Sequence, residues 1–548
     1  MFKKAKYAAG LVLILILFFE VFFYWLWLKE NKFFGFSVNT HMHSLEALRF
    51  YGLFYSDADA SQIIKAFFSP SLWPRLHYLF TAIAIDLFGR SYVSMGLVNI
   101  FYLAVLIISV FGITFKIAKN TKVSLASALI VSLYPGIVRF MGFYELQMGV
   151  SAFTALSVYL LLLSDSFTKR LFCLLFAFSF TFAMYLDRMT PLVFILGPVL
   201  YVLANSFKKG DRRVFVKTIL PNVMLTCMIA GLMLGLFYIP WFLGLDMNDL
   251  FSQKGLSGLS VWSESMNSSP AILLKRLGFY FLILPIYHLG IFWTAVFLFC
   301  LYFFFKSEIQ DKGVLVWWLM APLILFTMLP KKDFSYTIPA LVPLGMISAL
   351  GLHDFYQKSK SLLIYVFILC FGVFQFFIIL FAPAELYAKL FIPFDYRSDR
   401  TVANIGSVYY NKPLCSWITT EVAGCFPQNE KLSVAIVKDE HCVGWLDFEL
   451  GGTLLLRNPL NDISLLYLES ELDNFSLLRY DYLVFIENKD SYLTLEEAVK
   501  RAFIFRNRTH PGGFSDYTLI KQKNCPSYPV KVSIYRKNSS LKYKSESR

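Results

Sequence analysis

The stretch AAGLVLILILFFEVFFYWLWL, residues 8–28, decides the fold class because it is long and apolar enough to cross a lipid bilayer. It follows the basic start MFKKAK, which resembles the charged start of a signal peptide. No small-residue cleavage site comes after it, and the bulky segment FYWLWLKENKFF does. We therefore expect a retained signal anchor. A second run of this kind, SLLIYVFILCFGVFQFFIILFA, fills residues 361–382.

The composition places the whole chain among polytopic membrane proteins. Of its 548 residues, 57% are hydrophobic and only 16% are charged, which is too apolar for a soluble globular protein of this size. The formal net charge is +14, but the lysines and arginines gather in short segments between apolar runs, where they act as orientation signals. The positive charge therefore does not indicate a nucleic-acid partner.

The basic clusters predict how the chain threads through the membrane. They lie at residues 2–6, 116–122, 168–170, 208–213, 306–312 and 357–360, and we place all of them in the cytoplasm. About eleven transmembrane helices follow, at 8–28, 92–115, 123–141, 146–163, 171–187, 189–204, 217–238, 278–304, 314–329, 336–352 and 361–382. The apolar segment 76–89 is short, and counting it as a span would invert the basic turns. We expect a horizontal or re-entrant helix there.

This threading predicts two domains. Residues 1–385 form the transmembrane domain, with a cytoplasmic N-terminus, a first outer loop at 29–91 that carries amphipathic helices, and a large outer loop at 239–277. Residues 386–548 are polar and form a small extracytoplasmic α/β domain. Its expected strands lie at 432–437, 453–457, 480–488, 516–522 and 530–537, with a helix at 494–505. We expect an integral protein of the inner or plasma membrane.

The polar domain also contains Cys415, Cys425, Cys442 and Cys525. In an extracytoplasmic domain these cysteines are able to form disulfides, and three pairings are open.

Charged residues of both signs gather in the predicted outer loops. The segment PKKDFSYTIP at 330–339 falls on the outer face, where its lysines do not serve as cytoplasmic anchors. Acidic residues at a membrane boundary are costly unless they are paired or functional. A cleft with both signs at the membrane edge suits a substrate that has a lipid tail and an anionic head group.

The order of these features resembles the GT-C class of membrane glycosyltransferases, and within it protein O-mannosyltransferases and lipid A aminoarabinose transferases. The matching segments are HSLEALRFY, FFSPSLWPRLHYLFTAIAIDLFGRS, SLYPGIVRFMGFYELQ, YLDRMTPLVFILGP, YIPWF and PKKDFSYTIPALVPLGMISALGL. Three positions depart from the class pattern: the leading acidic pair reads Leu45-Glu46, the segment PPL reads SLWPRL, and Ser335 replaces an arginine. The resemblance covers residues 1–385.

The resemblance implies sugar transfer from a polyprenyl-phosphate donor to a lipid, glycan or protein acceptor on the outer face. It assigns Glu46 as the general base, with Asp59 or Asp57 as the runner-up, and Glu145 as the residue that orients the acceptor or Arg75. The lipid phosphate would be held by the basic residues Lys331, Lys332, Arg75 and Arg188 and by Tyr336.

Each assignment has a structural alternative. Glu46 is also suited to face solvent on a loop helix, and Asp57 or Asp59 is suited to cap the next helix. Glu145 is suited to pair with a charge at the end of a span. Lys331 and Lys332 are suited to snorkel to the membrane interface. His77 is expected to be an interfacial histidine. Some GT-C members require a divalent metal, so the resemblance leaves a divalent metal open as a cofactor. No acidic pair here has strong ligand spacing, so no residues are assigned to it and no other cofactor is expected. A flippase of lipid-linked glycans, another polyprenyl-dependent ligase or polymerase, and a non-catalytic membrane scaffold are the alternative functions.

Overall fold

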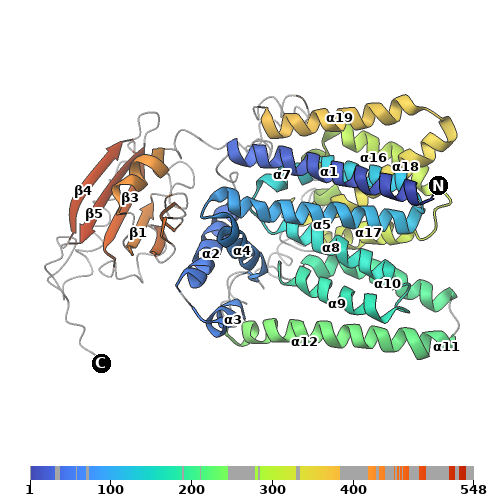
Figure 1. Ribbon diagram of the computed structural model, residues 1–548, viewed down its shortest axis with the longest axis horizontal. Helices are drawn as coiled ribbons and strands as arrows, with labels where there is room; N and C mark the ends of the chain where they lie inside the picture. The colour runs from blue at the N-terminus through green and yellow to red at the C-terminus, as the bar shows by residue number, and fades with distance from the viewer. Residues whose placement is uncertain are drawn as a thin grey trace, which may run out of the picture. The chain divides into compact units, whose positions relative to one another are not determined.

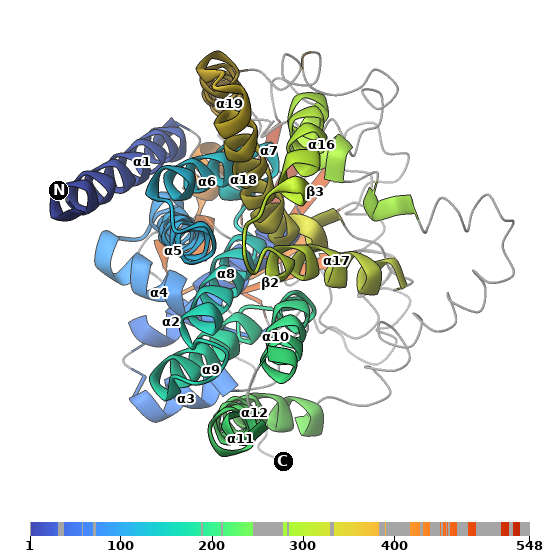
Figure 2. The same cartoon turned by 90° about the vertical axis from the view of Figure 1, so that its right-hand side faces the viewer.

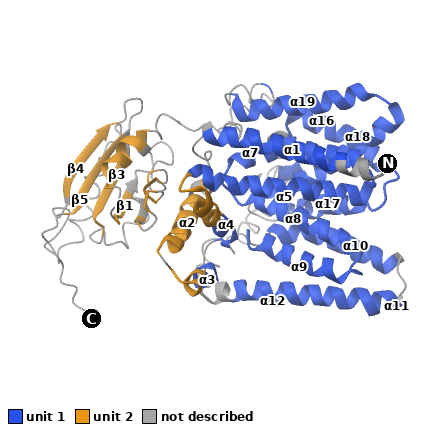
Figure 3. Cartoon of the chain, viewed as in Figure 1, with its two compact units in different colours: residues 1–35, 64–80, 92–408 blue, residues 36–63, 81–91, 409–548 orange. Residues whose placement is uncertain are grey.

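The computed structural model divides the chain into two compact units (Figure 3). Unit 1 contains residues 1–35, 64–80 and 92–408, and unit 2 contains residues 36–63, 81–91 and 409–548. The structure describes residues 2–30, 38–56, 58–68, 73–187, 190–209, 212–244, 278–281, 284–328, 334–382, 390, 417–427, 431–438, 450, 453–455, 457–458, 461–467, 480–488, 517–524 and 530–537. Parts of the predicted first outer loop therefore group with the C-terminal region. The domain boundary near residue 385 stays a prediction.

Unit 1 is a bundle of apolar helices (Figure 1). They are α1 Phe2–Glu30, α5 Tyr92–Ala118, α6 Thr121–Leu133, α7 Pro135–Gly142, α8 Gln147–Leu163, α9 Arg170–Met184, α10 Thr190–Lys209, α11 Arg212–Val214, α12 Leu220–Gly244, α16 Gly290–Lys306, α17 Gly313–Met328, α18 Leu341–Ser359 and α19 Leu362–Phe381. Two π-helical turns, η1 Phe215–Ile219 and η3 Leu284–Leu289, precede α12 and α16, and the 3₁₀ turn η4 Phe334–Ala340 precedes α18.

The hydropathy of these helices makes the chain an integral membrane protein. Among the described residues, six helices are long and apolar enough to span a membrane, or seven if the bent pair α6 and α7 counts as one. Five shorter apolar helices occupy four of the other predicted spans and the segment 76–89; they are α8, α9, α16, α17 and, at 76–89, α4 Leu76–Phe88. The total of about eleven spans stays a prediction.

A proline breaks the span that was predicted at 123–141. Helix α6 ends at Leu133, α7 begins at Pro135, and the two are bent by 56°. Proline suits the first position of a helix because its missing N–H group would have no intrahelical partner there. The predicted span therefore contains a break, and the turn that follows α7 carries Glu145.

Close helix contacts form the centre of unit 1. Seen along the bundle, α8 and α18 lie in its middle, and α1, α12 and α19 lie at its edge (Figure 2). A Cβ atom placed on Gly351 of α18 would stand 2.0 Å from the Cys300 carbonyl oxygen of α16, and one on Gly345 would stand 2.5 Å from Val131 of α6. Small residues let helix backbones approach closely, which is how membrane helices gain packing energy.

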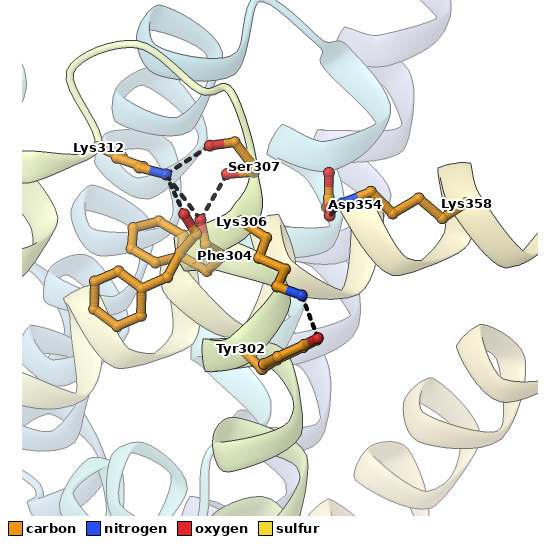
Figure 4. A network of polar contacts seen from close by, with 8 residues as sticks. Tyr302, Phe304, Lys306, Ser307, Lys312, Asp354 and Lys358 are labelled. Carbon is orange, nitrogen blue, oxygen red and sulfur yellow. Dashed lines mark hydrogen bonds and ion pairs between the residues drawn. The ribbon is translucent and has the colours of Figure 1, made fainter.

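A lysine closes the C-terminal end of α16 (Figure 4). The Lys312 ammonium group donates to the carbonyl oxygens of Phe304 at 3.2 Å, Phe305 at 2.8 Å and Ser307 at 2.6 Å. The last carbonyls of a helix have no intrahelical partner, and a cation satisfies them while it interacts favourably with the helix dipole. This basic turn between α16 and α17 therefore has a structural role as well as the predicted orienting one.

Unit 2 combines helices of the first loop with a mixed sheet. Its helical parts come from α2 Val38–Tyr55, α3 Ala60–Phe68 and α4 Leu76–Phe88, although α3 and α4 each continue into unit 1. The sheet has five strands in the order β2-β1-β3-β5-β4. These are β1 Ser433–Lys438, β2 Asp462–Tyr467, β3 Tyr482–Asn488, β4 Tyr517–Asn524 and β5 Val530–Lys537. Strand β1 pairs in parallel with β2 and β3, and β5 pairs antiparallel with β3 and β4.

Four of the five expected strands correspond to β1, β3, β4 and β5. The fifth was wrong: residues 453–455 of the segment TLLLR are helical, and the remaining strand is β2, which was not predicted. Short apolar runs do not distinguish strand from helix without their neighbours. The predicted helix at 494–505 lies outside the described residues, as do Cys415, Cys442 and Cys525. Cys425 is a free cysteine.

Candidate functional site

Glu46 lies on α2 and is paired within its own helix. The Arg49 Nη1 atom donates to Glu46 Oε1 at 2.7 Å, one helical turn further along. The other terminal nitrogen of Arg49 donates to the Ile463 carbonyl oxygen of strand β2 at 2.9 Å. About a third of the Glu46 side chain, 35%, is exposed. The carboxylate is thus accessible to a reactant and is also fixed by a guanidinium group.

Asp59 caps a helix. Its carboxylate accepts from the Ser61 hydroxyl at 2.7 Å and from the Gln62 backbone N–H at 2.8 Å, at the start of α3. These hydrogen bonds hold the pKa of Asp59 below its usual value. This is the structural role that the sequence offered as the alternative. Asp57 lies outside the described residues, and catalysis by either aspartate stays a prediction.

Glu145 is buried in the turn between α7 and α8, with only 3% of its surface exposed. Its backbone N–H donates to the Phe143 carbonyl oxygen at 2.9 Å. From α5, the buried side-chain amide of Asn99 donates to the carbonyl oxygens of Met141 at 3.0 Å and Phe143 at 2.8 Å. The turn that carries Glu145 is thus tied to a neighbouring span, as a positioned polar group requires.

His77 lies next to this turn and is fully buried in the protein, and its expected place at the membrane interface stays a prediction. Its Nδ1 atom is 3.1 Å from the Tyr102 hydroxyl, and its ring centroid is 4.5 Å from that of Tyr144, the neighbour of Glu145. Buried polar groups in a membrane protein are costly, and they persist where other polar groups satisfy them. His77, Tyr102 and Tyr144 therefore form one buried cluster in unit 1, and Glu145 follows Tyr144 in the sequence.

Two of the expected phosphate-binding residues are described. The Arg75 Nη1 atom donates to the Ala66 carbonyl oxygen at 2.7 Å, near the end of α3. The Tyr336 ring lies 5.6 Å from the Phe326 ring of α17, and the adjacent Thr337 hydroxyl is 3.0 Å from His288 Nε2. Arg188, Lys331 and Lys332 lie outside the described residues, so their proposed contact with phosphate stays a prediction.

An apolar cavity of about 410 Å³ lies between α16, α17 and α18, beside the π-helical turn η3. Along α16 it is lined by Thr294, Phe297, Leu298, Leu301 and Phe305. Of the described lining residues, only Thr294 has a polar side chain, and its hydroxyl donates to the Pro285 carbonyl oxygen at 3.3 Å. With no free polar group on this lining, the cavity suits a hydrocarbon chain.

The described residues include no group of three or more His, Cys, Asp or Glu side chains that could hold a metal ion. The sequence also gave no role to Arg49, Asn99 or His288. Signals for two of them were present: Arg49 follows Glu46 at helical spacing, and His288 is a polar residue within an apolar run. The contact of Arg49 with Ile463 had no local signal.

Comparison with solved structures confirms the expected fold. Two crystal structures of ArnT from Cupriavidus metallidurans, each 12% identical in sequence, match 96% of this chain and 98% of their own. The TM-score is 0.56 for the structure bound to undecaprenyl phosphate and 0.54 for the apo structure. No protein-family profile and no curated protein sequence matches the chain. The chain therefore has the GT-C fold of ArnT, a lipid A aminoarabinose transferase, together with a small C-terminal sheet.

Proposed function

We propose that this protein is a glycosyltransferase that moves a sugar from a polyprenyl-phosphate donor to an acceptor on the outer face of the membrane. The observation that carries the proposal is the fold likeness to ArnT, which extends over nearly the whole of both chains and includes a structure with undecaprenyl phosphate bound. The sugar is a hexose or a pentose, and the acceptor is a lipid, a glycan or a protein. A mannosyltransferase-like role in building the cell envelope fits this class.

The apolar cavity between α16, α17 and α18 would take the isoprenoid chain of the donor. Its α16 lining runs from Thr294 to Phe305, a helical length of about 17 Å. The turn η3 is at one end of this lining and contains His288, whose Nε2 atom is 3.0 Å from the Thr337 hydroxyl. Both residues are polar and buried. We expect the phosphate end of a chain in the cavity to lie at this end, near His288 and Thr337. The sequence between α17 and η4 contains Lys331 and Lys332.

The proposed chemistry gives each candidate residue one role. The acceptor oxygen or nitrogen attacks the anomeric carbon, and the bond from this carbon to the phosphate oxygen breaks, so that its electron pair stays on the phosphate. Lys331, Lys332, Arg75, Arg188 and Tyr336 would stabilise the charge that develops there. Glu46 would take the proton of the acceptor, and Glu145 would orient the acceptor. We expect the N-terminus in the cytoplasm and the C-terminal sheet outside, in an inner or plasma membrane.

Proteoliposomes test this proposal against its alternatives. With a polyprenyl-phosphate sugar labelled in the sugar and the lipid, we expect the label to reach an acceptor and free polyprenyl phosphate to accumulate. A flippase would move the intact donor between leaflets without releasing phosphate, and a scaffold would do neither. If release does not exceed that of protein-free vesicles, the proposed function is wrong.

A matched pair of variants tests the base. Glu46→Gln keeps the shape of the side chain and removes the proton acceptor, so transfer is expected to fall at least about a hundredfold. Glu421→Gln is the control, because Glu421 is another glutamate of unit 2 with a basic partner, Lys523 at 2.8 Å. Transfer by Glu421→Gln is expected to stay within about twofold of wild type. Equal rates for Glu46→Gln and wild type would remove Glu46 from the mechanism.

A further inference from the structure

The Arg49 side chain joins two parts of unit 2 that are far apart in the sequence. One terminal nitrogen binds the Glu46 carboxylate at 2.7 Å, and the other binds the Ile463 carbonyl oxygen at 2.9 Å. Arg49 and Ile463 are 414 residues apart in the sequence. The planar guanidinium group is suited to this arrangement because it presents several donors in a fixed fork.

The partner of Arg49 in the sheet, the Ile463 carbonyl group, is held in place by strand β2. Among the described strands, β2 is at the edge of the sheet, so part of its backbone faces no described strand on that side. Ile463 is itself buried and pairs in register with Val434 of β1. The Ile463 carbonyl therefore holds Arg49 against an ordered strand, whereas an exposed ion pair alone would restrain a long side chain only weakly.

A second arginine makes a comparable contact without a carboxylate. The Arg90 Nη1 atom donates to the Arg457 carbonyl oxygen at 3.2 Å, and its guanidinium lies 5.0 Å from the centre of the Tyr55 ring. Both arginines thus connect first-loop residues of unit 2 to the backbone of its C-terminal part. Only Arg49 also holds a candidate catalytic group.

We propose that Arg49 is a positioning residue through which the C-terminal sheet sets the orientation of Glu46. This inference rests on the proposed function, because it takes Glu46 as the general base. It adds a role for the C-terminal part of the chain: the edge strand β2 fixes Arg49, and Arg49 aims the Glu46 carboxylate. Misplacing a reacting group by about 1 Å is enough to lower a rate about a hundredfold.

The test compares Arg49→Gln with Arg90→Gln in the full-length protein in proteoliposomes. For Arg49→Gln, kcat is expected to fall about tenfold or more while the KM for the donor stays within about twofold, because binding is not affected. Arg90→Gln removes a contact of the same kind and is expected to leave kcat within about twofold. Hydrogen exchange at strand β2 is expected to become faster in Arg49→Gln than in wild type. Faster exchange would show that Arg49 contacts the strand in the wild-type protein.

The outcomes separate the two proposals. If wild type transfers sugar and Arg49→Gln keeps wild-type kcat, or if Arg90→Gln lowers kcat as much, the positioning role is wrong and the proposed function stands. Unchanged exchange at β2 in Arg49→Gln would equally overturn the role. If wild type transfers no sugar, the proposed function fails and the inference fails with it.

Discussion

The side-chain amide of Asn99 in α5 donates to the backbone carbonyl of Phe143 at 2.8 Å, and so ties a transmembrane helix to the turn that carries Glu145. The same nitrogen donates to the Met141 carbonyl at 3.0 Å. Because the amide is fully buried, no water is available to replace it. The position of Glu145 thus depends on a residue of another helix.

Asn99→Leu is expected to lower the free energy of unfolding by about 1–3 kcal/mol, because it leaves two buried carbonyls without this donor. Thermal unfolding in detergent measures the change. Asn222→Leu is the matched control, since the Asn222 amide donates to the Phe167 carbonyl at 2.7 Å in a different turn. Both variants are expected to lose stability, and only Asn99→Leu to lose sugar transfer. Equal transfer by the two would show that the Glu145 turn has no part in activity.

Gly351→Ala is expected to destabilise the bundle by about 1–3 kcal/mol, because the added methyl group would overlap the Cys300 backbone. Gly231→Ala in α12 has no atom within 4 Å of the new methyl group and is expected to be neutral or slightly stabilising. Urea or thermal unfolding of the purified proteins compares the two. A Gly351→Ala protein as stable as Gly231→Ala would contradict the close contact of α16 and α18.

Leu301→Trp is expected to raise the KM for a long-chain polyprenyl donor about tenfold, which corresponds to about 1.4 kcal/mol, because the larger ring fills the apolar cavity. A donor with a short, water-soluble chain is expected to be little affected. The control, Ile291→Trp, adds the same ring to α16 at an exposed residue outside the cavity lining. If both variants raise the KM equally, the cavity does not hold the donor chain.

Stability is expected to depend on pH through Glu421 and Lys523, which are 2.8 Å apart. The hydrogen bond and charge of Lys523 lower the pKa of Glu421, and Glu421 raises the pKa of Lys523 in the same way. The contribution of Glu421 is full above its ordinary pKa of 4.5 and is lost as the pH falls through the lowered value. The contribution of Lys523 is full below 10.5 and is lost as the pH rises through the raised value.

The Tm of wild type is therefore expected to exceed that of Lys523→Met between these limits and to converge with it in acid. A Tm difference that persists below the lowered pKa of Glu421 would mean that the ion pair is not its source. Lys537→Met, on the neighbouring strand β5, is the control for removing a positive charge from the sheet.

The sequence predicted those parts of the fold that depend on local composition. The apolar runs at 8–28 and 92–115 lie within α1 and α5, and the run at 361–382 extends one residue beyond each end of α19. Hydropathy over about twenty residues is itself the physical requirement for a span. The break before α7 also had a local signal in Pro135. The strand β2 had none that separated it from the nearby segment TLLLR, since both are short and apolar.

The candidate site was predicted less completely, since its arrangement depends on distant residues. Glu46 was chosen from the resemblance of its first-loop segment to the GT-C class, and Glu145 for its charge in a predicted outer loop, but the partner of Arg49 in the sheet is 414 residues away. The burial of His77 likewise follows from α5 and from the turn before α8, which meet it only in the folded bundle. Charge and hydropathy indicate where polar residues gather, and they do not indicate which of them touch.

One contact of the first helix has a consequence for how the chain is made. The Ser132 hydroxyl of α6 donates to the buried Glu20 carboxyl group of α1 at 2.7 Å, across 112 residues of sequence. During synthesis α1 emerges long before α6, so Glu20 enters the insertion machinery without this hydroxyl. The nascent first helix is then expected to stay near that machinery, or near water, until α6 arrives, so that membrane insertion of the first half of the chain is cooperative.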